Sequence, residues 1–350
     1  MSVHVGIDTG GTFTDFVALD AACARWYHSK VPSTPNEPLK AILGSFDAAG
    51  VDPHCVERIT LGTTVGTNAL LERKGAKVAY ITTAGFEDVP FIQRGNRKFH
   101  YDLHWIKPKP FINRRHSFGI PERLNYRGEP IQEIDFNALG ELENQLKRMQ
   151  DGAGLEAVAI NLLFSYLNPA HEIRVETWLQ QRFPGVPVSS SHRIAPVWRE
   201  YGRGLTTIAD AYLKPLLQAF LASIGEGLQS RGFSGSWSVL KSNGGTTLAA
   251  EAARDPVQLL LSGVAGGVMA GKRFGAEIAS DLISLDMGGT SCDLAVITRG
   301  EQRYAAQFEV DFGLPIVVPT IDVSTIGAGG GSIAWVDRGG FLRVGPQSAG

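Results

Sequence analysis

Two distant stretches of the chain follow one pattern: residues 5–15 read VGIDTGGTFTD and residues 283–293 read ISLDMGGTSCD. Both contain D-x-G-G-T-x-x-D. Alternating apolar residues lead into each copy and an apolar run leads out, so each copy predicts a β-hairpin with a tight polar turn. Paired glycines let a ligand approach the backbone closely and expose consecutive N–H groups to an anion. Two ordinary hairpins with solvent-facing aspartates are the alternative, but the matched Asp and Thr positions favour a ligand site.

The residue types of both copies suit the phosphates of a nucleotide bound with Mg²⁺. Asp8 and Asp286 end the leading strands, where a carboxylate can hold hydrated Mg²⁺ or orient a water, and we expect them to be the catalytic residues. Backbone N–H groups and threonine hydroxyls would contact the phosphates. The expected nucleotide-binding residues of the hairpins are Thr9, Gly10, Gly11, Thr12, Gly288, Gly289 and Thr290.

This duplicated hairpin resembles the actin, hexokinase and Hsp70 superfamily, in which two related lobes each contribute a hairpin to one nucleotide. The resemblance implies an α/β, two-lobe ATPase fold with a phosphate-binding β-hairpin in each lobe. We expect residues 1–200 to form the N-terminal lobe, with an insertion at about 85–125, and residues 201–350 to form the second lobe. Because a second lobe of this superfamily needs more chain, we expect this lobe to be incomplete and the polypeptide to be longer.

Between the hairpins, residue periodicity predicts alternating strands and helices. Apolar runs of the buried-strand type occur at 78–82 and 157–163. Helical spacing is seen at 39–49, 136–149, 171–182 and 200–230.

Composition and charge argue against several classes of protein. Hydrophobic residues are 43% and charged residues 19%, as in ordinary globular domains. The net charge of −2 gives no reason to expect a nucleic-acid or anionic-membrane partner, and no apolar run is long enough to predict a membrane span. The 3 cysteines form no C-x-x-C pair, and a strand begins too early for a signal peptide. We therefore expect a cytoplasmic protein with reduced thiols.

Five separated motifs carry a more specific resemblance. They are IDTGGTFTDFV at 7–17, LGTTVGTNALLER at 61–73, SNGG at 242–245, LDMGGTSCDLAVI at 285–297 and STIGAGGGSIAWVD at 324–337. Together they resemble the ATP-binding HyuA side of the hydantoinase/5-oxoprolinase family, which includes caprolactamase-type lactamases and the acetone and acetophenone carboxylases. Two positions depart from the family pattern. Cys292 stands where Thr, Ala or Phe is more usual, and S-G-V-A-G-G at 262–267 replaces S-G-P-A-x-G.

The family resemblance implies that ATP phosphorylates the oxygen of an amide or enolate, and that a HyuB-type subunit or domain completes the reaction. We expect a cyclic amide substrate (hydantoin, 5-oxoproline or a lactam) that is activated for ring opening, since GGTFTD resembles hydantoinases more than acetone carboxylase. A ketone carboxylase subunit is the first alternative. A sugar-kinase-like or activator ATPase, or a nucleotide-binding regulator without turnover, remains open.

A glycine run follows the second hairpin and could pass closely against the adenosine, because side chains there would block it. A flexible linker is the alternative. The expected nucleotide-binding residues of this run are Gly327, Gly329, Gly330 and Gly331.

Residues 99–105, FHYDLHW, suggest a metal site. His100, Asp102 and His104 alternate, and in an extended strand they would lie on one face. Two imidazoles and a carboxylate, with His116 as a fourth ligand, would suit Zn²⁺ or another divalent transition metal. A half-exposed strand with an ordinary polar face is the alternative.

Overall fold

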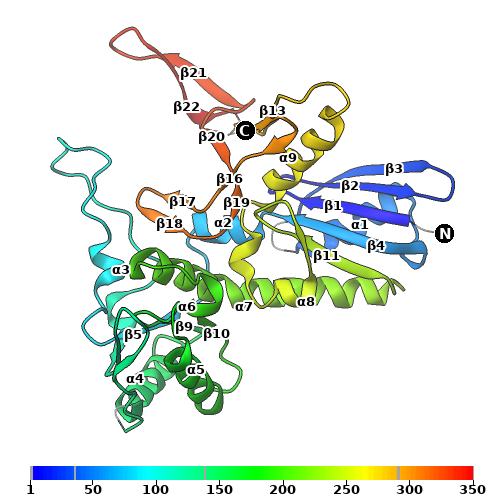
Figure 1. Cartoon of the computed structure of the whole chain (residues 1–350). Helices are drawn as coiled ribbons and strands as arrows, with labels where there is room; N and C mark the ends of the chain where they lie inside the picture. The colour runs from blue at the N-terminus through cyan, green and yellow to red at the C-terminus, as the bar shows by residue number, and fades with distance from the viewer. Residues whose placement is uncertain (1–2, 35–36, 138, 290–291, 350) are drawn as a thin grey trace.

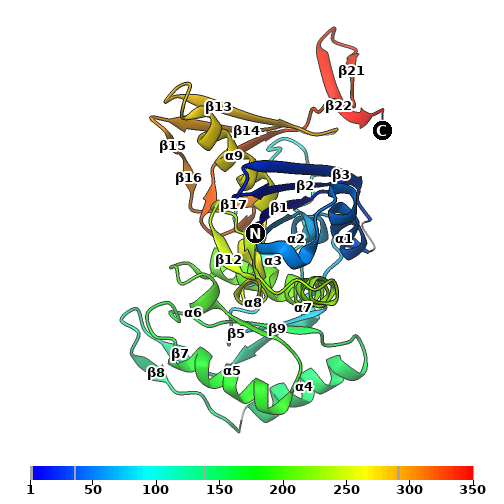
Figure 2. The same ribbon diagram turned by 90° about the vertical axis from the view of Figure 1, so that its right-hand side faces the viewer.

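The computed structural model describes residues 3–34, 37–137, 139–289 and 292–349 (Figure 1). One body is an N-terminal sheet, a second is a smaller α/β unit beside it, and a third is a β-rich C-terminal part that carries the second hairpin. In the view turned by 90°, the α/β unit and the C-terminal part lie on opposite sides of the N-terminal sheet (Figure 2).

The N-terminal sheet surrounds the first hairpin with strands on both sides. Its strand order is β12-β11-β4-β1-β2-β3; β1 pairs antiparallel with β2 and parallel with β4. Alternate residues of β1 are buried, as a strand with one face on a core requires. Helix α1 (Pro38–Ala49) packs on this sheet. The strands are β1 (Val3–Thr9), β2 (Phe13–Asp20), β3 (Arg25–Pro32), β4 (Val56–Thr63), β11 (Ser236–Leu240) and β12 (Thr246–Leu248).

The α/β unit is built on a parallel sheet of order β10-β9-β5-β6. Strands β5 and β9 read VAYITT and AVAIN and are buried throughout, as expected for parallel strands covered on both faces. The strands are β5 (Val78–Thr83), β6 (Ser117–Ile120), β9 (Ala157–Asn161) and β10 (Val188–Ser190). Apolar residues of helices α4 (Leu139–Asp151) and α5 (Ala170–Arg182) pack with this sheet in one core.

Helix α7 (Glu200–Ser230) joins these two bodies. It packs on β9 in the α/β unit and on α1 and α2 (Val65–Leu71) at the N-terminal sheet, and most of its first half is buried. A buried ion pair within the helix joins Lys214 Nζ and Asp210 Oδ2 at 3.0 Å. The predicted strands and helices between the hairpins are confirmed, with ends that differ by a few residues.

The C-terminal part contains a sheet of β13, β14, β15 and β20 that packs against helix α9 (Ser262–Gly275). These strands are β13 (Leu282–Met287), β14 (Cys292–Thr298), β15 (Glu301–Gln302) and β20 (Val323–Ile326). The C-terminal part also contains three two-stranded sheets: β16 (Tyr304–Ala305) with β19 (Thr320–Ile321), β17 (Phe308–Asp311) with β18 (Leu314–Ile316), and β21 (Ser332–Val336) with β22 (Leu342–Ser348). The last pair projects from the body (Figures 1 and 2).

Short elements complete the chain. The short helices are α2 (Val65–Leu71), α3 (Val89–Ile92), α6 (Ser191–Ile194) and α8 (Ala249–Ala252); the 3₁₀ turns are η1 (Pro53–Cys55), η2 (Arg114–His116) and η3 (Pro256–Leu259); the remaining strands are β7 (Arg123–Leu124) and β8 (Pro130–Gln132). Among the helices in the described ranges, none is both long and apolar enough to span a membrane.

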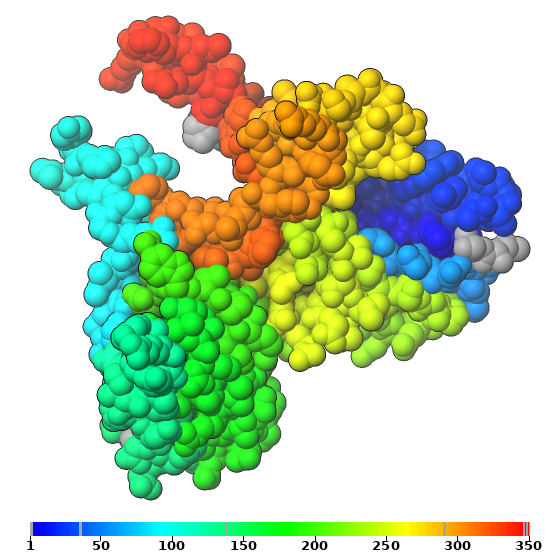
Figure 3. All heavy atoms as spheres, viewed as in Figure 1, coloured from blue at the N-terminus to red at the C-terminus, as the bar shows by residue number. Residues whose placement is uncertain are grey.

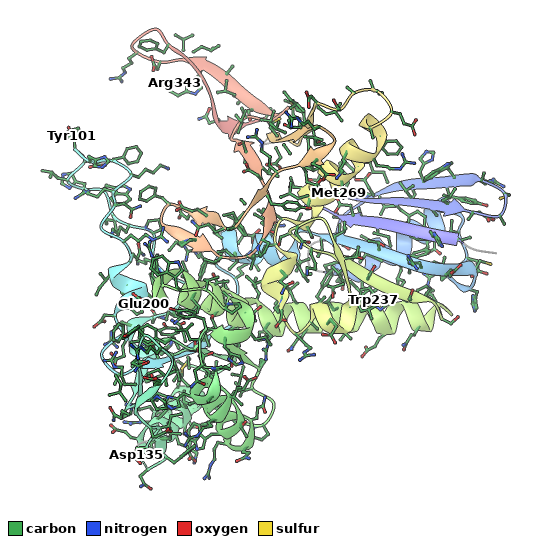
Figure 4. All side chains as sticks on the ribbon, in the orientation of Figure 1. Tyr101, Asp135, Glu200, Trp237, Met269 and Arg343 are labelled. Carbon is green, nitrogen blue, oxygen red and sulfur yellow. The ribbon has the colours of Figure 1, made fainter. Side chains whose placement is uncertain are left out.

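Residues on both sides of the lobe boundary expected at residue 200 contribute to the N-terminal sheet, and the boundary itself stays a prediction. Strand β11 pairs parallel with β4, and β12 pairs with β11, so the chain returns to the N-terminal sheet after α7. The expected insertion at 85–125 also includes β6, which is a regular member of the α/β unit. Its irregular part is residues 93–113. The tip of this part, with Tyr101, stands away from the body (Figures 3 and 4), whereas Phe111 and Ile112 are buried in the main core.

Candidate nucleotide-binding site

The first motif forms the predicted hairpin. In its register Asp8 lies opposite Asp15, and the Gly10 N–H donates to the Phe13 carbonyl at 3.0 Å to close the turn. A Cβ atom on Gly10 would lie 3.1 Å from that carbonyl oxygen, whereas a Cβ on Gly11 would meet no atom within 4 Å. The turn therefore leaves little room for a side chain at residue 10, and at Gly11 it has an open face that a ligand can approach.

The second motif forms the same hairpin in the same register, with Asp286 opposite Asp293. Both copies thus place their two aspartates across from each other, which explains why the motif spaces them by seven residues. Thr290 lies outside the described residues, so the hairpin is defined here by its two strands and by Gly288 and Gly289 of the turn.

Both hairpins contact one face of helix α9. A Cβ on Gly263 would lie 3.2 Å from Asp8 Oδ1, and a Cβ on Gly267 would lie 3.9 Å from Asp286 Oδ2. Residues four apart lie on one face of a helix, so the two carboxylates follow each other along α9. The same spacing continues with Gly271 and Gly275, which face β13. The missing side chains allow β13 to approach the helix backbone.

The two leading aspartates also interact electrostatically. The pKa of Asp8 is raised because neighbouring atoms displace part of its hydration, and because Asp15 and Asp286 carry the same charge nearby. Lys30 opposes this effect only in part, since its Nζ pairs with Asp15 Oδ1 at 2.9 Å. Carboxylates that crowd together at an exposed position have the chemistry of a Mg²⁺ site.

One buried group in the first hairpin is unsatisfied. The Thr9 side chain is 4% exposed, and its Oγ1 finds no hydrogen-bond partner among the residues that the structure describes. Buried hydroxyls normally have partners, but this one lies on the core-facing side of β1, opposite to the exposed side of Asp8, because side chains alternate along a strand. The open face at Gly11 and the aspartates together fit a magnesium-bound phosphate.

The glycine run lies against the second hairpin. The Gly330 N–H donates to the Gly288 carbonyl at 2.9 Å, and the Gly331 N–H donates to the Gly289 carbonyl at 2.7 Å. The Gly329 N–H donates to Ser332 Oγ at 2.9 Å. These bonds exclude the free linker and place the run beside the turn. Contact of Gly327, Gly329, Gly330 and Gly331 with adenosine stays a prediction.

The predicted strand at His100, Asp102 and His104 is wrong. These residues lie in turns, where Asp102 Oδ1 accepts from the His104 N–H at 2.9 Å. Within the described ranges, no strand pairs with this segment to hold it extended. His116 is buried in η2, where burial and the neighbouring Arg115 lower its pKa. In the described part of the chain, no group of three or more His, Cys, Asp or Glu side chains is placed to hold a metal ion.

Comparison with known proteins identifies the family. Residues 4–183 match the family model for the hydantoinase/oxoprolinase N-terminal region, and residues 203–350 match the model for hydantoinase/oxoprolinase. The chain belongs to the hydantoinase/oxoprolinase family. This membership confirms the resemblance that the five motifs carry.

Relatives within this family differ in activity. Caprolactamase subunit alpha of Pseudomonas jessenii is 34% identical over 99% of this chain and 51% of its own length. Acetophenone carboxylase gamma subunit of Aromatoleum aromaticum is 30% identical over 99% of this chain and 49% of its own length. An uncharacterized protein of Methanocaldococcus jannaschii is 36% identical over 100% of this chain and 53% of its own length. The chain thus spans about half the length of these relatives.

Solved structures confirm the α/β fold. The ATP-dependent caprolactamase from Pseudomonas jessenii matches with a TM-score of 0.88 and 32% identity, over 99% of this chain and 51% of that one. A nucleotide-free acetone carboxylase matches with a TM-score of 0.82 and 27% identity over the same shares. The mixed α/β architecture with its two hairpins is therefore an actin-like ATPase fold, as the duplicated motif predicts.

The structure explains where the two departures from the hydantoinase/oxoprolinase pattern lie. Cys292 is buried at the start of β14, between Met287 and Ile326 in the sheet, so a small apolar side chain suits it. Val264 stands in the first turn of α9, which follows Leu261 in a left-handed conformation at φ 59°.

A cavity of about 610 Å³ was missed by sequence reasoning. It lies between α2, the start of α9 and strands of the C-terminal part, so its walls come from segments far apart in sequence. The quoted motif LGTTVGTNALLER was the available signal: its residues Thr64, Thr67 and Asn68 line the cavity. Two of them also hold the surrounding loops, since Thr64 Oγ1 donates to the Thr9 carbonyl and Thr67 Oγ1 accepts from the Leu261 N–H.

Proposed function

We propose that the chain is the ATP-binding part of an ATP-dependent hydrolase, which phosphorylates a cyclic amide for ring opening. The observation that carries this proposal is the convergence of the two hairpins on α9, with Asp8 and Asp286 near enough that the charge of one raises the pKa of the other. A single ligand that spans both hairpins, such as the phosphates of ATP, would use both turns.

In this proposal the chain's own residues position and neutralise the phosphates. Backbone N–H groups of residues 11–12 and 288–289 would donate to phosphate oxygens. Asp8 and Asp286 would hold Mg²⁺, which supplies charge neutralisation when bound. Phosphoryl transfer depends mainly on positioning and on charge stabilisation, which these groups provide.

The proposed chemistry activates the amide at its oxygen. The amide oxygen would attack the γ-phosphorus, and ADP would leave with the electron pair of the broken P–O bond. Water would then add to the activated carbonyl carbon, and the ring C–N bond would break as the nitrogen leaves with the electron pair and takes up a proton. A second water would hydrolyse the remaining acyl phosphate to a carboxylate and phosphate. We propose that a HyuB-type subunit or domain carries out these hydrolytic steps. Two relatives, caprolactamase subunit alpha and acetophenone carboxylase gamma subunit, are subunits of larger enzymes, and this supports a partner subunit for the present chain.

A ketone carboxylase subunit is the second candidate. The match to acetone carboxylase over 99% of the chain favours it, because the same phosphorylation step could act on an enolate oxygen. The cyclic amide is preferred because the caprolactamase structure has the higher TM-score, 0.88 against 0.82, and the higher identity, 32% against 27%.

The deciding experiment measures ATP hydrolysis with Mg²⁺ by the full-length protein together with its copurifying partner. We expect ε-caprolactam, hydantoin or 5-oxoproline to stimulate hydrolysis. If acetone or acetophenone stimulates ATP hydrolysis, and does so only in the presence of bicarbonate, the protein would instead be a ketone carboxylase subunit. ATP hydrolysis that none of these compounds changes would instead indicate an activator ATPase.

A further inference from the structure

The cavity of about 610 Å³ adjoins both hairpins. Gly263, which faces Asp8, and Asp293 of the second hairpin are among its lining residues. Its volume is within the range of small-molecule sites, which are commonly 300–1,000 Å³. A molecule bound here would therefore lie next to the position proposed for the phosphates.

The walls of the cavity are largely apolar. Leu70 and Leu71 of α2 form part of one wall, and Phe308 and Val310 of β17 form part of another. Val264, at one of the family departures, adds a further apolar side chain from α9. Such walls suit a small hydrocarbon ring better than the strongly charged phosphates.

All the charged side chains that line the cavity have the same sign. Asp293, Glu309 and Asp322 contribute carboxylates, while the lining residues within the described ranges include no Lys, Arg or His. Two of the three carboxylates have one partner each: Asp293 Oδ1 accepts from Thr325 Oγ1 at 2.5 Å, and Glu309 Oε2 accepts from the Gly313 N–H at 3.1 Å. A bound anion would find no opposite charge, and like charges at close range repel.

We propose that this cavity binds the phosphoryl acceptor and selects an uncharged lactam-type ring over a ring that carries a carboxylate. The proposal rests on the proposed function. The charge of the cavity also fits the reaction. When the amide oxygen forms its bond to phosphorus and ADP leaves, the amide N–H is retained and positive charge develops on the nitrogen. Carboxylates nearby stabilise that charge.

The first test measures binding by calorimetry on the full-length protein, with ε-caprolactam and 5-oxoproline as probes and with a non-hydrolysable ATP analogue and Mg²⁺ present. We expect ε-caprolactam to bind at least about tenfold more tightly than 5-oxoproline. The carboxylate of 5-oxoproline would lie near the carboxylates of the cavity, and repulsion between two such charges near a protein surface is large enough to lower the affinity by that factor. Tighter binding of 5-oxoproline would overturn the charge selection.

Two variants test the place of binding. Leu71→Trp on α2 and Val310→Trp on β17 fill the cavity from opposite walls, and neither residue belongs to the hairpins. Both should weaken ε-caprolactam at least about tenfold and leave the affinity for the ATP analogue unchanged. Ile173→Trp is the matched control, since Ile173 is 48% exposed on α5, outside the cavity. Unchanged ε-caprolactam binding in both cavity variants, with melting temperatures like wild type, would overturn the proposal.

A charge variant tests the selectivity itself. Glu309→Lys should shift the preference toward 5-oxoproline by at least about fivefold, because it converts a repulsive contact into an attractive one.

Loss of ATP-analogue binding in the tryptophan variants would assign the cavity to the nucleotide and overturn the proposal. If the wild type fails to bind the ATP analogue but binds ε-caprolactam in the cavity, the proposed function falls and the cavity assignment stands.

Discussion

The two hairpins have the same sequence plan and register but different surroundings. The first lies in the middle of a six-stranded sheet, with β4 on one side and β3 on the other. In the second, β20 extends the sheet beyond β14, whereas no strand in the described ranges pairs with the other edge of β13. The equivalent residues Ile7 and Leu285 are 4% and 58% exposed. The motif therefore specifies the conformation of the turn and the positions of the aspartates, whereas the other strands of each sheet determine how far the hairpin itself is buried.

What the hairpins share is their contact with α9. Gly263 and Gly267 bring the helix backbone close to Asp8 and Asp286, although one hairpin is buried in a sheet and the other is largely exposed. Met269, further along α9, lies at the junction between the N-terminal sheet and β13 (Figure 4). From this comparison we propose that turnover depends on the helix contact, whereas the stability of the fold depends on the sheet, and the following variants separate the two.

The largest effect is expected on turnover. Asp8→Asn and Asp286→Asn should each lower substrate-stimulated ATP hydrolysis by roughly 100-fold or more, because each removes a charge proposed to act on Mg²⁺. Steady-state assays on the complex with its partner measure this, with Asp151→Asn at the exposed end of α4 as control. Near-normal turnover in either variant would show that its hairpin has a structural role only.

The next effect concerns stability. Ile7→Ala should lower the free energy of unfolding by about 3 kcal/mol, because it empties a packed position in the core. Leu285→Ala, at the equivalent position, should cost less than about 1 kcal/mol, since that side chain already contacts solvent. Urea denaturation followed by circular dichroism measures both. Equal losses would mean that β13 is covered in solution.

Nucleotide affinity should change by a smaller amount. Gly11→Val places a side chain where the protein itself has no atom within 4 Å, so the fold should persist while ATP binding weakens about tenfold, or ~1.4 kcal/mol. Gly289→Val should weaken it similarly if both turns contact phosphate. Gly140→Val is a matched control, because its Cβ would also enter open space, on α4. Unchanged affinity in one hairpin variant would remove that turn from the site.

The smallest effect is a gain in stability. Because the pKa of Asp8 is raised in the folded protein, its ionised form destabilises the nucleotide-free fold, fully so above the raised pKa. Asp8→Asn should therefore raise the free energy of unfolding at pH 7 by less than about 1 kcal/mol, since the exposed side chain is screened by solvent. The gain should disappear as the pH falls through the raised pKa. A gain that is independent of pH would contradict this cause.

Local patterns in the sequence predicted the hairpins, the main helices and the buried strands, because alternation and helical spacing are properties of neighbouring residues. The return of residues 236–240 to the N-terminal sheet was not predictable in this way, since pairing with β4 leaves no mark in SWSVL itself. Alternation at 99–105 was misleading because a strand needs a partner as well as a pattern. The cavity was missed because its walls join only after folding.

The glycine face of α9 has a geometrical consequence. Each residue of an α-helix advances the axis by about 1.5 Å, so the four-residue step from Gly263 to Gly267 sets a spacing of about 6 Å along the axis between the two contacts with carboxylates. The number of residues between the two glycines therefore fixes how far apart along the helix Asp8 and Asp286 make their contacts. Inserting one residue within that step would turn the second contact by about 100° as well as shift it, so the two carboxylates would no longer face one ligand.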